Sequence, residues 1–85
     1  DERLRKAQSV TDAANRILSS IERRSLKFSD AEQLNTYFAS DSLVLKTGEM
    51  VERLRELDYA VKADDIDSRF KWIKEQALRS LKENP

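Results

Sequence analysis

The sequence predicts an all-α protein: a compact bundle of about five helices, long first and last with short middle ones. Apolar residues recur at three- and four-residue steps over most of the chain, which is the period of amphipathic helices. One glycine and one proline leave no material for the tight turns of a β-protein. In 85 residues, 39% of them apolar, there is room for one modest core. We therefore expect a single domain over residues 1–85.

The first helix is expected from about Glu2 to Ser25. Ser9 and Thr11 fall within the span of its apolar face, so a kink or a second start near Thr11-Asp12 is an alternative. The apolar face consists of residues at helical spacing: Leu4, Ala7, Val10, Ala14, Ile17, Leu18 and Ile21.

A second helix is expected from about Asp30 to Phe38, after an interruption at Lys27-Phe28. Ser29 and Glu32 have the spacing of a capping box, in which each side chain accepts a hydrogen bond from the other residue's backbone N–H. We therefore predict that Ser29 caps this helix.

Two further breaks are expected in the middle of the chain. Ser40-Asp41-Ser42 is rich in capping residues and should start a very short helix over residues 43–45. Gly48, the only glycine, suits a left-handed exit that would end this turn. A fourth helix should then run from Glu49 to Leu57.

The last helix is expected to begin at Asp64 or Asp65, either of which can cap it, and to run to about Lys82. A cation site at Asp64, Asp65 and Asp67 is disfavoured, because the alternating ligands and central glycine of a calcium loop are missing. The apolar face of this helix comprises Ile66, Phe70, Ile73, Ala77 and Leu81.

Composition excludes several classes of function. The chain has no cysteine and no histidine, which removes Cys/His zinc sites, thiol nucleophiles and imidazole bases. We expect no enzyme, no catalytic residue, no metal and no cofactor. No apolar run approaches the roughly 18 residues of a membrane span.

The charge balance disfavours direct binding of nucleic acid, because Lys plus Arg equals Asp plus Glu at sixteen each. Trp72 lies off the apolar stripe of its helix, and whether it is exposed or covered stays open. The alternative, a nucleic-acid surface, would use Arg23, Arg24, Lys27, Arg69, Lys71, Trp72 and Lys74.

The main candidate for a binding site is a set of apolar residues in the connections between helices. Phe28 precedes the second helix, and Tyr59 and Val61 precede the last one. Such side chains either cover the core or offer a surface to a partner. If the two connections meet at one end of the bundle, they would form an apolar notch. Asp30 could then accept hydrogen bonds from the backbone of a bound peptide.

Three segments of the chain carry a resemblance to a known family: Ser25-Leu26-Lys27-Phe28-Ser29-Asp30, Lys46-Thr47-Gly48-Glu49-Met50-Val51 and Tyr59-Ala60-Val61. In their order they resemble the integrase-binding domain of the lens-epithelium-derived growth factor type, within the wider class of transcription elongation factor S-II N-terminal domains. The resemblance implies that Tyr59 and Val61 grip the ligand, that Phe28 stands for a first-loop aliphatic residue, and that Asp30, or Ser29 in its place, holds the ligand backbone.

The resemblance implies a nuclear, non-catalytic docking module for short disordered peptide segments of transcription or chromatin factors, with apolar anchors among acidic residues. Because the chain begins at Asp1, we expect a domain excised from a longer protein, and we expect a monomer. The alternative is a spectrin-like or coiled-coil segment for spacing or self-association. That alternative requires three long helices with sustained heptads, whereas breaks recur between Phe28 and Asp65.

Overall fold

The computed structural model describes residues 1–83, and within them all regular structure is helical. The elements are α1 (Glu2–Ser25), α2 (Ala31–Ser40), α3 (Ser42–Glu56) and α4 (Ala60–Glu83). The prediction of an all-α bundle is confirmed, with four helices instead of about five. Long outer helices are confirmed too: α1 and α4 have 24 residues each, against 10 in α2 and 15 in α3.

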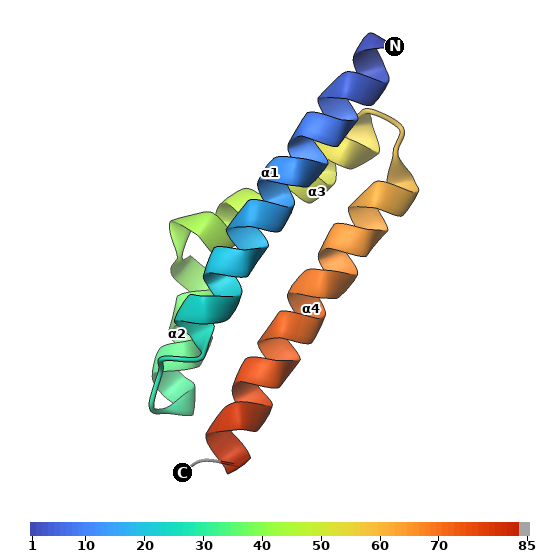
Figure 1. Cartoon of the computed structure of the whole chain (residues 1–85). Coiled ribbons are helices and arrows are strands. Elements are labelled where there is room, and N and C mark those ends of the chain that lie inside the picture. Colours follow the sequence, from blue (N-terminus) through green and yellow to red (C-terminus); the bar gives the residue numbers. More distant parts are fainter. Residues whose placement is uncertain (84–85) are drawn as a thin grey trace.

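The path of the chain makes α1 and α4 parallel neighbours (Figure 1). Lys62 donates to the side chain of Gln8, and further along both helices Arg69 donates to Asn15, as parallel helices require. The helices α2 and α3 both run in the opposite direction, one after the other, so they act as a single broken return helix (Figure 1). The result is an elongated bundle with extents of 49 × 20 × 16 Å.

One residue, Asp41, makes the break between α2 and α3. Its backbone N–H donates to the carbonyl of Tyr37 and closes α2. Its side chain accepts from the N–H groups of Leu43 and Val44, at 2.9 and 3.3 Å, and so caps α3. The predicted break at Ser40-Asp41-Ser42 is therefore confirmed.

The predicted break at Gly48 is wrong, because α3 continues through it. Gly48 has an ordinary negative φ and lies exposed in the middle of the helix. A glycine inside a helix costs only about 1 kcal/mol. That cost is smaller than the gain from the buried side of α3, which carries Val44, Thr47, Val51 and Leu54.

The left-handed residue of this region is Asp58, with φ of 71°, at the end of α3. The N–H of Asp58 donates to the carbonyl of Arg55 at 3.0 Å, and the N–H of Tyr59 donates to that of Leu54 at 2.9 Å. These two bonds form a Schellman motif, which satisfies the last carbonyls of a helix and reverses the chain.

The start of α4 at Ala60 corrects the prediction that Asp64 or Asp65 caps it. Asp64 lies beyond the first turn and accepts from Arg55 of α3 at 3.0 Å. Val61 consequently belongs to the first turn of α4 and not to a connection. The prediction that Ser29 caps α2 is also wrong by one residue, because Asp30 accepts from the N–H of Gln33 at 2.8 Å.

The core runs along the whole length of the bundle. Ala7, near the start of α1, is fully buried, so the residues before Thr11 belong to the bundle. The alternative of a second start near Thr11 is not realised, because α1 is one continuous helix. The buried apolar residues are Ala7, Ala14, Leu18, Ile21, Leu34, Phe38, Val44, Val51, Leu54, Leu57, Ala63, Ile66, Ile73 and Ala77.

Candidate functional site

The five residues predicted to bind a peptide lie at two opposite ends of the molecule. Phe28, Ser29 and Asp30 are in the link between α1 and α2, whereas Tyr59 and Val61 are where α3 turns into α4. Figure 1 shows these two connections at opposite ends of the long axis. The prediction of one shared notch is therefore wrong. The physical reason is that α2 and α3 run in the same direction, so the chain crosses the length of the bundle between the two connections.

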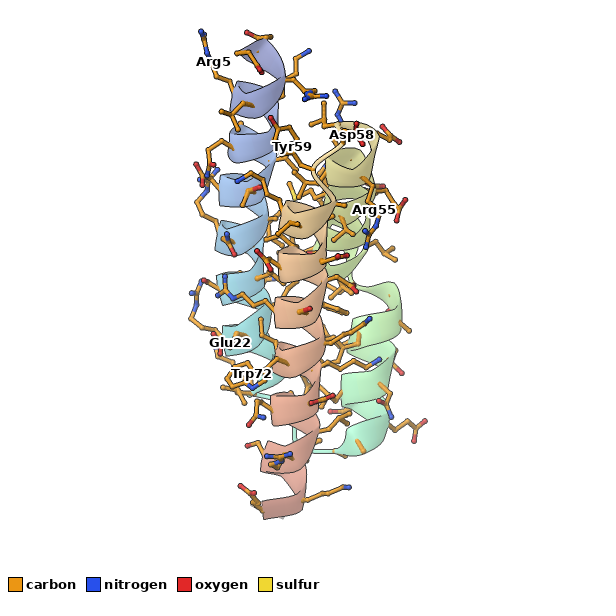
Figure 2. The ribbon with its side chains drawn as sticks, turned by 90° about the vertical axis from the view of Figure 1, so that its right-hand side faces the viewer. Arg5, Glu22, Arg55, Asp58, Tyr59 and Trp72 are labelled. Carbon is orange, nitrogen blue, oxygen red and sulfur yellow. The ribbon has the colours of Figure 1, made fainter. Side chains whose placement is uncertain are left out.

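At the α3–α4 end, Tyr59 is engaged within the protein. Its side chain is half-buried against the core, and the guanidinium carbon of Arg3 lies 5.4 Å from the centre of its ring. Figure 2 shows Tyr59 next to Asp58, beside the upper part of α1. Val61 is 74% exposed on α4. Tyr59 thus packs between the start of α1 and the α3–α4 turn. Its side chain covers the core instead of offering a surface to a partner.

At the α1–α2 end, the surface is hollowed into an open groove of about 540 Å³. The groove lies over the outer side of α2 and the link that precedes it. It contains two of the predicted residues, Phe28 and Asp30, while Ser29 beside them is exposed. The residues that line it are Phe28, Asp30, Glu32, Gln33, Thr36 and Tyr37.

The floor of this groove is aromatic. The rings of Phe28 and Tyr37 lie 5.0 Å apart, with their planes inclined by 43°. Tyr37 in turn contacts Phe38 edge-on at 5.3 Å, and Phe38 contacts Phe70 of α4 at 5.8 Å. Because Phe38 belongs to the buried core, this chain of rings fixes the floor to the interior of the bundle.

Tyr37 lines the groove but is not among the residues that the sequence predicts to bind a peptide. The signal that could have found it is the spacing of Asp30, Gln33 and Tyr37, which follow each other by three and four residues. Such residues share one side of a helix. All three line the groove.

The hydroxyl of Tyr37 is buried and has no hydrogen-bond partner among residues 1–83. Burial raises the pKa of this hydroxyl above its ordinary value of 10.0, and the negative charge of Asp41 raises it further, while Arg24 acts in the opposite sense. The ring therefore stays neutral at physiological pH.

Asp30 has a local structural role and can still bind a ligand. Its Oδ1 atom accepts from the N–H of Gln33 and caps α2. A carboxylate has about four acceptor positions on its two oxygens, so capping does not exhaust it. The groove thus offers apolar contact on its floor and hydrogen-bond acceptors on its rim.

A second hollow of about 380 Å³ lies between α2, α3 and α4. Gly48 lines this hollow, and a Cβ added there would meet nothing within 4 Å. Its charged residues carry both signs: Glu52 and Asp67 against Arg55 and Lys74. The mixed rim gives no preference for one kind of charge, so this hollow is the weaker candidate.

The exposure of Trp72 is settled by the structure. The side chain is 53% exposed on α4, near the level of Glu22 on α1 (Figure 2).

Among the described residues, no group of three or more carboxylates has the arrangement of a metal site. Over the same part of the chain, no helix is both long and apolar enough to cross a bilayer.

Comparisons with known proteins found no match: no family model, curated protein or solved structure matched the chain.

Proposed function

We propose that this protein is a non-catalytic docking module that binds a short disordered peptide segment in the groove over α2. The observation that carries the proposal is the pair of Phe28 and Tyr37, half-buried and in ring contact on the floor of a surface hollow. An apolar anchor of a peptide can cover these rings, and polar groups at the rim can bind its backbone.

The wider setting of the proposal rests on the sequence resemblance. By that resemblance, the bound segments belong to transcription or chromatin factors and the module acts in the nucleus. The site differs from the one that the resemblance implies, because Tyr59 and Val61 belong to the α3–α4 end of the bundle, far from the groove. Tyr37, in place of Tyr59, supplies the tyrosine ring of the site.

The test is binding of an array of overlapping peptides from disordered regions of transcription-elongation and chromatin proteins. The tightest peptide is then titrated against wild type, Phe28→Ala, Phe28→Leu and Val61→Ala. Loss of one aromatic anchor should weaken binding about tenfold or more, with Phe28→Leu in between. Val61→Ala, at the opposite end, is the matched control and should bind as wild type.

Two results would count against the site. One is unchanged affinity of Phe28→Ala in a variant shown to be folded by circular dichroism. The other is a loss confined to Val61→Ala, which would return the site to the α3–α4 end. If no peptide of the array binds, the docking function itself is rejected.

A second candidate function, a spectrin-like spacer or self-association segment, is favoured by the path of the chain. The break between α2 and α3 does not reverse direction, so the bundle is long and narrow, at 49 × 20 × 16 Å. Exposed Leu26, Leu45 and Trp72 offer apolar contacts to another copy. Sedimentation at rising concentration separates the two functions, because a dimer would support this one and a monomer the peptide-docking one.

A further inference from the structure

The rim of the groove over α2 is negatively charged. Asp30 and Glu32 are the charged residues that line it, and both are exposed. The other polar residues of the lining, Gln33 and Thr36, are neutral. Lys27, the next cation along the chain, is exposed and does not line the groove. The groove therefore combines an aromatic floor with an anionic rim.

The N-terminus of α2 opposes this charge but does not cancel it. A helix N-terminus carries about half a positive charge, from N–H groups without a partner in the helix. Two carboxylates at neutral pH carry about two negative charges. One N–H of this turn, that of Gln33, is already bound by Asp30. Arg24 also acts on Tyr37 of the floor, but the opposite charge of Asp41 acts on the same hydroxyl with the larger effect. The sum of charge around the groove therefore stays negative.

We propose that the segment bound here carries a lysine or arginine side chain in the groove, an inference that rests on the proposed docking function. The aliphatic stem of that side chain covers the rings of Phe28 and Tyr37. Its cation lies near the ring faces and the carboxylates of Asp30 and Glu32, and both groups attract it. An acidic side chain in the same place would meet two like charges.

This proposal departs from what the resemblance implies, which is an apolar anchor among acidic residues. The difference is open to a direct test with three labelled peptides that share one Gly/Ser frame. All three carry a central leucine, and they differ only in the residue that follows it, which is lysine, glutamine or glutamate. Amide chemical shifts of residues 28–37 report binding in the groove, and their titration gives the affinity.

The lysine peptide should bind about tenfold more tightly than the glutamine peptide, and the glutamate peptide should bind least. The double variant Asp30→Asn/Glu32→Gln removes the rim charge and keeps the cap of α2, because Asn caps as well as Asp. In it the lysine peptide should lose most of its advantage over the glutamine peptide, because only the ring faces then attract the cation. Glu56→Gln/Asp58→Asn, two neutralised acids at the opposite end, is the matched control and should keep the preference.

Three results would overturn the inference and leave the docking function standing. The first is glutamine or glutamate peptide binding as tightly as lysine peptide, with the binding lost in Phe28→Ala. The second is a lysine preference that is as large in Asp30→Asn/Glu32→Gln as in wild type. The third is that none of the three peptides binds in the groove although a natural segment does. If no segment of either kind binds, the docking function fails and the inference fails with it.

Discussion

The N–H of Tyr59 donates to the carbonyl of Leu54 at 2.9 Å, and this bond closes α3 around Asp58 in a left-handed conformation. Asp tolerates this conformation better than most residues, but glycine adopts it without steric cost. Asp58 is therefore less favourable than glycine at the left-handed position of this Schellman turn.

Replacing Asp58 with glycine should raise the free energy of unfolding by about 0.5–1 kcal/mol, because the left-handed conformation then costs nothing. Urea denaturation at neutral pH measures the change. Asp58→Asn is the control, since it removes the charge while keeping a side chain that tolerates this conformation. Destabilisation by Asp58→Gly would mean that the aspartate side chain, and not the backbone, sustains the turn.

Gly48→Ala should stabilise the protein by about 0.5–1 kcal/mol, because an exposed glycine in a helix interior costs about that much relative to alanine. The substitution is free of clashes, since a Cβ there meets nothing within 4 Å. Thermal and urea unfolding give the change in stability. A clear loss of stability would show that Gly48 ends a helix, and it would contradict a continuous α3.

Tyr37→Phe should leave the stability at neutral pH unchanged or raise it by about 1 kcal/mol, because the lost hydroxyl is buried and has no partner among the described residues. Urea denaturation of the two proteins measures the difference. Tyr59→Phe is the matched control for a tyrosine at the other end. A loss of more than about 1 kcal/mol would show that the hydroxyl is hydrogen-bonded in the folded protein.

Tyr37 should also make stability fall at alkaline pH. Its pKa is raised in the folded protein above the ordinary 10.0, so the unfolded chain loses the proton first as pH rises. The free energy of unfolding then decreases as pH increases above 10.0, up to and through the folded pKa. In Tyr37→Phe this loss of stability should be missing, so the pH profiles of wild type and variant should diverge above pH 10.0. Parallel profiles would contradict the raised pKa.

The contact of Arg69 with Asn15 should couple α4 to α1. Nη1 of Arg69 donates to Oδ1 of Asn15 at 2.8 Å, and Nη2 donates to Ser19 at 3.2 Å, in a half-buried site. A double-mutant cycle of Asn15→Ala and Arg69→Ala should give a coupling of about 0.5–1.5 kcal/mol. The exposed pair of Arg53 and Glu56 should give a coupling nearer zero. Equal coupling energies for the two pairs would show that the contact between Arg69 and Asn15 stabilises the fold no more than an exposed ion pair does.

The parts of the fold that the sequence predicts well are those fixed by a long apolar period. The bounds of α1 follow from such a stripe, and Glu2–Ser25 is confirmed. The predicted bounds of α3 and α4 depend on single residues, with Gly48 as a stop and Asp64 or Asp65 as a start. Burial of α3's apolar side outweighed the glycine, and the α3–α4 turn was hidden because an aspartate, Asp58, stands where glycine usually would.

The candidate site could be predicted in part. Phe28 is predicted because a large apolar residue is unusual in a connection, and Asp30 because its carboxylate could hold a peptide backbone. Both line the groove. That Tyr59 is remote from them could not be read from the sequence. It depends on whether the chain reverses at Asp41, and a capping residue there is compatible with a reversal or with a continued direction.

The most direct measurement of the central claim is a map of amide chemical-shift changes on the wild-type protein, with the tightest-binding natural peptide added to saturation. Binding in the groove over α2 predicts that the largest changes fall between Phe28 and Tyr37, with little change near Tyr59 and Val61. Largest changes at the α3–α4 turn, or along the exposed sides of α1 and α4, would contradict it.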